Sequence, residues 1–424
     1  MITIVGAGLA GLSAAYHLGK EYTVLEKDSE VGGLCKSISI NGYVFDYAPH
    51  ILFSRNQYIR DLFHNLLEDN ILTQARRAYI YMMGTYVKYP FEANLHPLPQ
   101  KVKEECIRGV MEKPNLEPCN FYEWIQTTMG SGIADYYMVP YNVKIWKYPL
   151  KQMNTEWIAG RVPSPSVKEM RKGAETPQPL DYGPNAEFWY PTHGGIGALA
   201  KSLAENVSVK LGAEATWFNP SVSGVDTLYV EDGEEKSIKS EKVLSSIPLP
   251  EIIAKIDDVP SEVRTATDNL VYNSLVCVMI GIKRPNITDK HWLYFPEKDF
   301  IFNRISFPMN FSPYTTPEGC SSILVEVTYR NKSIDLEETK KRVIDGLVKS
   351  NLINRRDEID VCKAMDFKYA YVIYDLHHGK NVKVIHEYLT AHSIIPLGRF
   401  GEWEYYNMDK AILSGKNAAE EINI

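Results

Sequence analysis

Closely spaced cysteines are absent from this sequence. Its six cysteines, Cys35, Cys106, Cys119, Cys277, Cys320 and Cys362, lie far apart, and no C-x-x-C pair occurs. In a chain of 424 residues, such scattered thiols are typical of a reduced intracellular protein. They argue against a disulfide framework or a zinc site, so we expect no metal centre.

A long apolar run is also absent. No stretch of about eighteen consecutive apolar residues occurs, so we expect no membrane-spanning helix. The apolar N-terminal stretch is too short and too rich in glycine for a signal peptide. These features predict a cytoplasmic protein.

The sequence has no excess of positive charge. Its formal net charge is −7 at pH 7, whereas general nucleic-acid binding needs a basic face. We therefore expect no nucleic-acid partner, and any anionic ligand must be met by a few placed arginines. Internal repeats and low-complexity segments are missing too. The sequence leaves the oligomeric state open.

Aromatic residues, by contrast, are plentiful. The 27 tyrosines and 7 tryptophans favour a wide, partly wet pocket that stacks rings and donates hydroxyls, although tyrosines also populate ordinary strands and interfaces. The length favours two or three domains around a shared cleft.

A strand, a glycine loop and a helix open the chain. Ile2–Val5 is strand-like, residues 9–18 have the apolar spacing of a helix, and residues 22–25 form a second strand that ends in Glu26. This order predicts a βαβ unit of the doubly wound kind.

Three glycines, Gly6, Gly8 and Gly11, lie between that strand and that helix. The first permits a tight turn, the second lets a pyrophosphate approach the backbone, and the third lets helix and strand pack closely. Glu26 follows Gly6 by twenty residues, where a carboxylate accepts ribose hydroxyls. A glycine turn without a ligand is the alternative, but the strand and helix around it favour dinucleotide binding.

A second glycine turn follows at once and favours FAD over NAD. Residues 30–33 contain Gly32 and Gly33, and residues 41–46 continue along the expected flavin path. Simple NAD domains rarely have this continuation.

The rest of the chain alternates between helical and strand-like patterns. Helices are predicted over residues 56–70, 100–135, 336–350 and 409–422, and after Gly194 and Gly195. Strands are predicted over residues 78–89, 242–247 and 367–374. The pattern within 271–330 predicts antiparallel strands. Five prolines between 163 and 187 predict a long loop there without regular structure, a candidate lid. The pair His377 and His378 matches no motif, and we interpret both as surface residues.

Several ordered segments carry a resemblance to a known family. Besides the glycine opening, they are residues 89–94, 140–146, 156–162, 183–185, 190–195, 292–297, Arg304, 368–371, 398–401 and 407–409. With them the chain resembles the FAD-dependent UDP-galactopyranose mutases, and the eukaryotic-type members more than the common bacterial ones. A generic flavin amine oxidase would share only the first and last of these segments.

The resemblance implies roles for individual residues. Arg161 and Arg304 would clamp the substrate diphosphate, a task that suits planar guanidinium groups, and His50 would lie beside the isoalloxazine; these three form the implied catalytic set. The implied substrate contacts are Tyr89, Glu92, Asn142, Trp146, Asn185, Tyr294, Tyr371 and Tyr405. The implied FAD contacts are Gly6, Gly8, Leu9, Ala10, Gly11, Glu26, Lys27, Gly33, Leu34, His50, Arg399, Asn407, Met408 and Asp409. Without the motifs, a lone arginine is more often a solvated surface charge and a lone histidine a structural one.

The resemblance also implies a redox-neutral reaction that needs reduced FAD. The flavin N5 attacks the anomeric carbon of a UDP-sugar, UDP leaves, the flavin–sugar adduct opens as an iminium, another hydroxyl recloses the ring, and UDP returns. The activity would interconvert pyranose and furanose forms, as in galactofuranose supply for cell-surface polysaccharide.

The implied fold is mixed α/β, with a Rossmann-like FAD-binding domain, a helical insertion and an antiparallel β-sheet domain. The expected division is 1–77, 188–268 and 380–424 for the FAD-binding domain, 95–187 for a mostly helical nucleotide-binding domain with the mobile loop 163–187, and 78–94 and 269–379 for the antiparallel substrate domain.

The sequence departs from the family pattern in three segments. Ala48 and Pro49 precede His50 where the family has two glycines, and the proline narrows a backbone motion that accompanies flavin reduction. Glu92 replaces a glutamine near the nucleotide, and Phe311 replaces a tyrosine that meets phosphate. These changes leave another sugar or nucleotide open.

Two other functions remain open from the sequence. One is a flavin oxidase or desaturase of the amine-oxidase and protoporphyrinogen-oxidase type, which shares the FAD scaffold. The other is a flavoprotein that binds a sugar nucleotide without converting it.

Overall fold

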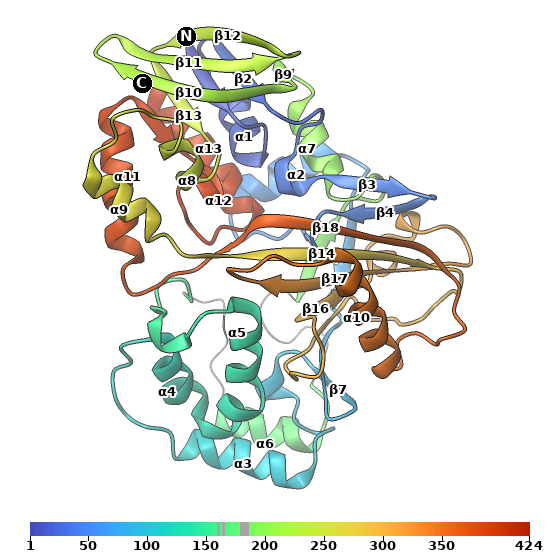
Figure 1. Cartoon of the computed structure of the whole chain (residues 1–424). Coiled ribbons are helices and arrows are strands. Elements are labelled where there is room, and N and C mark those ends of the chain that lie inside the picture. The colour runs from blue at the N-terminus through green and yellow to red at the C-terminus, as the bar shows by residue number, and fades with distance from the viewer. Residues whose placement is uncertain (159–161, 163–165, 179–185) are drawn as a thin grey trace.

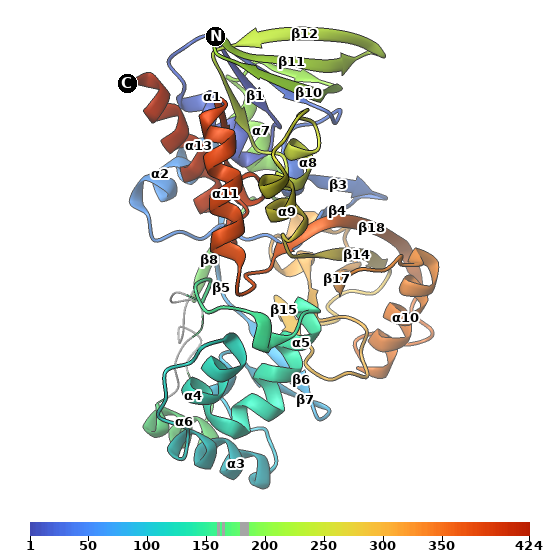
Figure 2. The same cartoon turned by 60° about the vertical axis from the view of Figure 1, so that its left-hand side comes forward.

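Two large sheets and a group of helices make up the molecule (Figures 1 and 2). The computed structural model describes residues 1–158, 162, 166–178 and 186–424. The predicted mixed α/β class, with a parallel sheet and separate antiparallel sheets, is confirmed. No helix among the residues so described is both long and apolar enough to cross a membrane.

A five-stranded parallel sheet contains the predicted opening of the chain. Every neighbouring pair in it is parallel. Its strands, in order, are β19 (Ile394–Pro396), β13 (Lys242–Ser245), β1 (Ile2–Val5), β2 (Tyr22–Glu26) and β9 (Val209–Leu211). All four residues of β1 are buried, as expected for a parallel strand that is covered on both faces. The sheet therefore joins strands from four separate parts of the chain.

The first and last long helices pack on each other beside this sheet. These are α1 (Leu9–His17) and α13 (Met408–Asn423). A Cβ on Gly415 would lie 2.0 Å from the carbonyl oxygen of Ala10, so glycine is required for this approach. The Ser13 hydroxyl also donates a 2.7 Å hydrogen bond to the Ile412 carbonyl. The helices α7 (Gly197–Ala204) and α2 (Gln57–Leu67) complete this side.

A three-stranded antiparallel sheet covers the end of the molecule at the top of Figure 1. It consists of β10 (Ala213–Ser221), β11 (Gly224–Glu231) and β12 (Glu234–Ser240). The sequence analysis did not predict it. The signal that could have found it is Asp232 and Gly233, which have φ values of 55° and 80° in the turn between β11 and β12 and form the Asp-Gly pair typical of a tight hairpin.

The second large sheet has seven strands. In order they are β18 (Ile359–Val372), β14 (Tyr272–Ile282), β17 (Ser321–Tyr329), β16 (Arg304–Ser306), β15 (Trp292–Tyr294), β6 (Ala78–Met82) and β7 (Thr85–Lys88). The predicted antiparallel pairing is confirmed between neighbours except for β15 and β6, which are parallel. Helix α10 (Leu336–Lys349) packs against one face of the sheet (Figure 1).

The register of this sheet brings candidate residues together. Arg304 on β16 pairs with Glu326 on β17 and with Tyr294 on β15. Cross-strand partners have neighbouring side chains, so the sheet itself positions these three residues.

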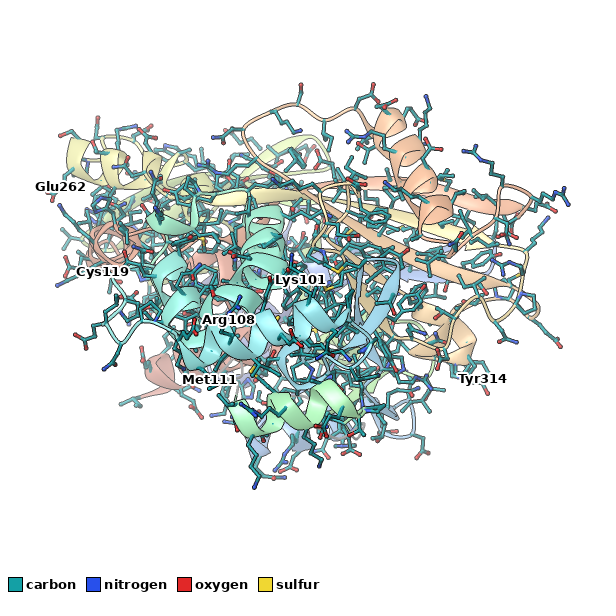
Figure 3. The ribbon with its side chains drawn as sticks, turned by 90° about the horizontal axis from the view of Figure 1, so that it is seen from below. Lys101, Arg108, Met111, Cys119, Glu262 and Tyr314 are labelled. Atoms are coloured by element: carbon teal, nitrogen blue, oxygen red, sulfur yellow. The ribbon has the colours of Figure 1, made fainter. Side chains whose placement is uncertain are left out.

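The helical group at the bottom of Figures 1 and 2 contains α3 (Gln100–Met111), α4 (Phe121–Ile133), the π-helical turn η3 (Ala134–Met138) and α5 (Val139–Trp146). The stretch predicted as helical over 100–135 is therefore two helices. Seen from below, α3 presents Lys101 and Arg108 (Figure 3). Gly109 and Gly132 permit close packing, since a Cβ on Gly109 would lie 2.6 Å from the Gly132 nitrogen.

Helix α5 joins this group to the seven-stranded sheet. Asn273 of β14 donates a 2.7 Å hydrogen bond to the Ile145 carbonyl, and Thr328 of β17 donates one of 2.8 Å to the Lys144 carbonyl. These carbonyls belong to the last turn of α5, which has no further helical partners for them. The side chains on α5 are thereby fixed over the sheet.

The prediction of an irregular loop over 163–187 is wrong for residues 167–175. Residues 167–175 form helix α6 (Val167–Glu175), which begins where the Ser166 hydroxyl accepts a 3.4 Å hydrogen bond from the Glu169 nitrogen. The prolines lie on both sides of this helix and leave its interior free, and Ser166 with Glu169 matches a capping box. Residues 163–165 and 179–185 lie outside the described residues, as does the hinge expected at Arg161.

The interpretation of His378 as a surface residue is wrong as well. It begins α11 (His378–Ala391) and is only 3% exposed. Its Nε2 lies 2.9 Å from the Trp403 carbonyl, and its ring stacks on Tyr374. His377, one residue earlier, is exposed.

The remaining named elements are β3 (Ser37–Ile40), β4 (Tyr43–Asp46), β5 (Leu72–Ala75), β8 (Glu187–Tyr190), α8 (Leu249–Ile253), α9 (Ser261–Asp268), α12 (Gly398–Gly401) and the short turns η1 (Gly33–Cys35), η2 (Phe91–Ala93), η4 (Leu150–Gln152), η5 (Pro308–Asn310) and η6 (Pro313–Thr315).

Candidate functional site

The glycine loop and Glu26 are locked together at the carboxyl ends of β1 and β2. The Glu26 carboxylate accepts hydrogen bonds of 2.6 Å from the Ala7 nitrogen and 3.0 Å from the Asp28 nitrogen. A Cβ on Gly11 would lie only 1.9 Å from the Gly6 carbonyl oxygen, which is why the third glycine is needed. Gly8 begins α1 with no side chain capping the helix, so the first amides of α1 are available to an anion.

The second glycine turn lies against the first. The Gly32 nitrogen donates a 2.8 Å hydrogen bond to the Ala7 carbonyl, and Gly33 has φ of 56°. A Cβ on Gly33 would lie 3.2 Å from the Gly8 Cα. The two turns thus form a narrow backbone cradle without side chains. Of the neighbouring predicted contacts, Leu34 is half-buried at this cradle and Lys27 is exposed.

The C-terminal loop approaches the same helix end. A Cβ on Gly398 would lie 2.6 Å from the Cβ of Ala10, so α12 touches the first turn of α1. Asn407 is the residue before α13, Met408 is largely buried, and Asp409 accepts a 2.9 Å hydrogen bond from the Ser54 hydroxyl. Residues predicted at both ends of the sequence therefore meet around α1.

Arg399 connects this loop to the seven-stranded sheet. Its guanidinium donates 2.9 Å hydrogen bonds to the carbonyls of Tyr406 and Ala370. It lies 5.4 Å from the ring centre of Tyr371 and 4.8 Å from that of Tyr405, within the range of cation–π attraction. Arg399 is thus held rigidly between the loop and β18.

His50 lies within electrostatic range of two arginines. Burial and the positive charges of Arg399 and Arg304 together lower the pKa of the imidazole to about 4, against the opposing effect of a hydrogen bond with the Ala48 backbone. The ring is therefore neutral at pH 7. Its Nδ1 is buried and has no hydrogen-bond partner among the described residues.

Arg304 is held by a carboxylate that the sequence analysis missed. The guanidinium of Arg304 donates to both oxygens of Glu326, at 2.9 Å for Nη2 and Oε1. The Tyr371 hydroxyl lies 3.4 Å from the same Oε1. Burial works to lower the pKa of Arg304, but Glu326 holds it well above its ordinary value. The signal for Glu326 was its place as the one charged residue in the apolar stretch 321–329.

The ion pair with Glu326 covers only part of the Arg304 side chain. The Arg304 side chain keeps 26% of its surface exposed, against 1% for Glu326. A guanidinium group whose donors are occupied by Glu326 on one side and exposed on the other can bind a second anion from outside the chain. Tyr294, the other cross-strand neighbour of Arg304, accepts a 3.0 Å hydrogen bond at its hydroxyl from Trp292.

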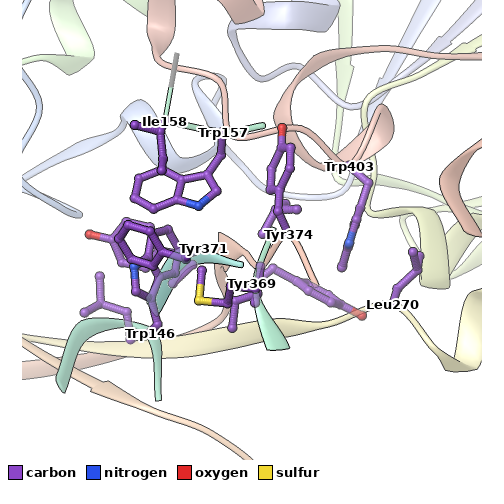
Figure 4. Close-up of a cluster of buried hydrophobic side chains, with 14 of the residues drawn as sticks. Trp146, Trp157, Ile158, Leu270, Tyr369, Tyr371, Tyr374 and Trp403 are labelled. Atoms are coloured by element: carbon purple, nitrogen blue, oxygen red, sulfur yellow. The ribbon is translucent and has the colours of Figure 1, made fainter. Parts of the chain in front are cut away.

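Trp146, Trp157 and Tyr371 belong to one cluster of buried aromatic side chains (Figure 4). The ring of Trp146 lies 4.9 Å from Trp157, 5.9 Å from Tyr371 and 5.7 Å from Tyr405. Asn142 accepts a 3.0 Å hydrogen bond from the Trp146 indole and fixes its orientation. The predicted residues Asn142, Trp146, Tyr371 and Tyr405 are thus brought together.

Tyr89 packs against Tyr294, and Glu92 follows Tyr89 by three residues. The rings of Tyr89 and Tyr294 are 5.7 Å apart. The guanidinium of Arg76, a residue that the sequence analysis missed, lies 4.9 Å above the Tyr89 ring and is 5% exposed. Glu92 is also buried.

Two predicted residues, Arg161 and Asn185, lie outside the described residues, so their roles stay predictions. Phe311 lies in the core, with its ring centre 5.3 Å from that of Tyr190 and 5.7 Å from that of Phe188. Within the described part of the chain, no three or more His, Cys, Asp or Glu residues are grouped so as to hold a metal ion.

A cavity of about 680 Å³ opens elsewhere, beside β5 and β8. Its described lining includes Ser54, Arg55, Arg60, Glu187 and Trp189 and contains none of the predicted site residues. The hydrogen bond from Ser54 to Asp409 links it to the predicted FAD contacts.

Residues 9–423 match the family of flavin-containing amine oxidoreductases. The chain belongs to this family. A reduced UDP-galactopyranose mutase of known structure is 27% identical to this family member, with a TM-score of 0.93 over 99% of this chain and 95% of the other. The predicted resemblance to UDP-galactopyranose mutases is confirmed, and the closer likeness to eukaryotic-type members stays a prediction.

Two curated relatives match shorter stretches of this amine oxidoreductase family member. UDP-galactopyranose mutase of Mycoplasma pneumoniae is 24% identical over 200 residues, which are 41% of this chain and 49% of that protein. Protoporphyrinogen oxidase 2 of Arabidopsis thaliana is 24% identical over 163 residues, which are 33% of this chain and 31% of that protein.

The residues of this amine oxidoreductase family member fit the flavin that the family name implies. At the cradle of Gly8 and Gly33, a Cβ on Gly33 would crowd the Gly8 Cα at 3.2 Å, and the free amides of α1 meet this cradle. Two buried polar atoms, His50 Nδ1 and Arg399 Nε, have no partner in the described part of the protein. Buried polar atoms normally find partners, and a bound flavin would supply them.

Proposed function

We propose that this protein is an FAD-dependent mutase that interconverts the pyranose and furanose forms of a UDP-sugar such as UDP-galactose. The observation that carries the proposal is Arg304, which Glu326 anchors and whose side chain remains 26% exposed. It lies beside Tyr371, whose ring centre is 6.0 Å from that of Tyr405. The likeness over the full chain to a reduced UDP-galactopyranose mutase supports it.

In this proposal, separate groups of residues bind the diphosphate, the sugar and the cofactor. Arg304, together with Arg161, binds the diphosphate and stabilises the charge that develops on it as the bond to the sugar breaks. Tyr294 and Tyr371 donate hydroxyls beside it, and Trp146 orients the sugar. His50 and Arg399 hold the cofactor ring. Bound in its reduced form, FAD would supply the electron-rich nitrogen that the exchange of ring forms requires.

Turnover under reducing conditions tests the proposal. Purified protein with bound flavin is incubated with UDP-galactopyranose or UDP-galactofuranose, with and without dithionite, and the products are separated by chromatography. We expect conversion only in the reduced sample. Binding of UDP-galactose that perturbs the flavin spectrum without any conversion would instead identify a protein that binds the sugar nucleotide only.

A flavin oxidase is the second candidate, because the matched family and the Arabidopsis relative are oxidoreductases. Against it stands the Arg304 and Glu326 pair, since an amine or an apolar substrate does not need a guanidinium group. Oxygen consumption with amines or a porphyrinogen, without sugar conversion, would favour the oxidase.

Pro49 offers a prediction about flavin reduction. Proline fixes φ and lacks an N–H, and Pro49 precedes the half-buried His50. Replacing Pro49 with glycine should raise turnover several-fold or make the flavin easier to reduce, measured as kcat and as the midpoint potential. Pro49→Ala, which frees the N–H with less added flexibility, is the matched variant. Unchanged kcat and potential in Pro49→Gly would rule out a restraining role.

A further inference from the structure

The cavity beside β5 and β8 shares no described lining residue with the site around Arg304. Its volume of about 680 Å³ lies within the roughly 300–1,000 Å³ of most small-molecule sites. Helix α2, which lies above β5 and β8 in Figure 2, contributes Arg60. The segment before α2 contributes Phe53, Ser54 and Arg55, and β8 contributes Glu187 and Trp189.

Two arginines give this cavity a positive charge. The described lining contains Arg55 and Arg60 against a single carboxylate, Glu187, although the chain as a whole has a formal net charge of −7. Neither arginine forms an ion pair with a described residue. Guanidinium groups bind phosphate and carboxylate oxygens in a bidentate manner, so this lining suits an anionic ligand.

Arg60 also has an unused donor. Its Nη2 donates a hydrogen bond to Oε1 of Gln57, a neutral side chain that leaves the positive charge uncompensated. Its Nε is buried and has no hydrogen-bond partner in the described part of the chain. A buried donor without an acceptor costs free energy, and an anion that reached Nε from the cavity would remove this cost.

Two aromatic side chains, Phe53 and Trp189, line the same cavity. Both are half-buried, so part of each side chain remains accessible. Trp189 is held in place, because its ring packs edge-to-face against His64 with ring centres 5.5 Å apart and its backbone exchanges hydrogen bonds of 2.8 and 2.9 Å with Leu52. A fixed aromatic ring beside two guanidinium groups suits a ligand that combines a planar ring with an anionic group.

Ser54 connects the cavity wall to the predicted flavin contacts. Its hydroxyl donates a 2.9 Å hydrogen bond to Oδ2 of Asp409 and accepts one of 3.1 Å from the Asn56 nitrogen. An anion held by Arg55 and Arg60 would bring negative charge close to this link, and negative charge disfavours the uptake of electrons by a flavin. Binding in the cavity should therefore change the flavin absorbance and lower the flavin midpoint potential.

We propose that the cavity is an accessory site for a small anion that carries a planar ring. Arg55 and Arg60 bind its phosphate or carboxylate group, and Trp189 stacks on its ring. This site goes beyond the proposed sugar-nucleotide conversion and does not depend on it, because its described lining has no residue in common with the site around Arg304.

Phenyl phosphate and benzoate are two simple probes with this chemistry. Calorimetry with the oxidised, flavin-loaded protein measures the Kd of each, and the tighter of the two identifies the anionic group that the site takes. We expect Arg55→Gln/Arg60→Gln to weaken the binding of this probe by about tenfold or more, because hydrogen bonds to charged groups are lost. Glu187→Gln, which removes the carboxylate of the described lining, should strengthen binding about threefold.

The ring of the probe is tested separately. Inorganic phosphate or acetate, the matching anion without a ring, should bind about tenfold more weakly than the probe to the parent protein. Trp189→Leu should reduce that difference. Saturation with the probe should also shift the flavin absorbance and lower the midpoint potential in the parent protein, but not in Arg55→Gln/Arg60→Gln.

Arg304→Ala and Arg108→Gln are the controls. The probe should still bind to both variants, because Arg304 belongs to the other site and Arg108 is exposed on α3. Loss of binding in Arg304→Ala with retention in Arg55→Gln/Arg60→Gln would place the probe at the diphosphate site and overturn the proposal. Failure of both probes to bind the parent protein at millimolar concentration would overturn it as well. Sugar conversion is not part of the readout, so failure of the proposed function leaves each of these outcomes unchanged.

Discussion

Alanine in place of Arg304 should lower kcat/KM for the UDP-sugar by roughly 100- to 1,000-fold, the usual effect of removing one preorganised charge from a developing anion. The exposed part of the guanidinium is the part that can meet the diphosphate, while Glu326 fixes its direction. Initial rates of sugar conversion with dithionite-reduced protein, corrected for flavin content, measure the effect.

A second variant is needed because Arg304→Ala also leaves Glu326 buried and unpaired. Such a charge costs about 3 kcal/mol, so part of any loss of activity in the single variant could come from instability. In Arg304→Ala/Glu326→Gln the leftover charge is gone, and we expect stability to recover in urea unfolding while turnover stays low. Arg108→Ala, on the exposed side of α3 (Figure 3), should change neither. Turnover close to that of the parent in the double variant would remove Arg304 from the proposed mechanism.

Alanine in place of Gly11 should abolish flavin retention. The added Cβ would lie 1.9 Å from the Gly6 carbonyl oxygen, and both atoms belong to backbone, so the loop and α1 must move apart. That movement would open the cradle of Gly8 and Gly33, and the overpacking should destabilise the protein by about 1–3 kcal/mol. The flavin absorbance per protein after purification, and the urea midpoint, measure the two effects.

Gly379 provides the matched control for that experiment. It lies in α11, and a Cβ there would meet no heavy atom within 4 Å. Gly379→Ala should keep the flavin and stabilise the helix by up to about 1 kcal/mol. A Gly11→Ala protein that carries as much flavin as the Gly379→Ala protein would contradict the cradle.

The opening of the chain could be predicted because its signals are local. The glycines of 6–11, the carboxylate at the end of the second strand and the periodicity of 9–18 all lie within thirty residues. They specify a turn, a helix and a strand without reference to the rest of the molecule. The structure has these elements at the predicted places.

Several features of the structure were not predicted from the sequence. Some depend on contacts between separate segments of the chain, and others had a local sequence signal that an opposing signal outweighed. Glu326 meets Arg304 only through the register of β16 and β17, and Arg76 meets Tyr89 because the β6–β7 hairpin brings Tyr89 back beside Ala78. Helix α6 was missed because five flanking prolines outweighed the capping signal at Ser166. His378 was assigned to the surface because its partner, the Trp403 carbonyl, lies in another element.

The packing of α13 on α1 has a consequence for synthesis of the protein. The Ser13 hydroxyl and the Ala10 carbonyl meet Ile412 and Gly415, so α1 lacks this neighbour until translation has passed α13. Contacts of such sequence separation form late and slowly. A growing chain should therefore remain colourless until α13 has left the ribosome, and deleting α13 should yield a polypeptide that never turns yellow.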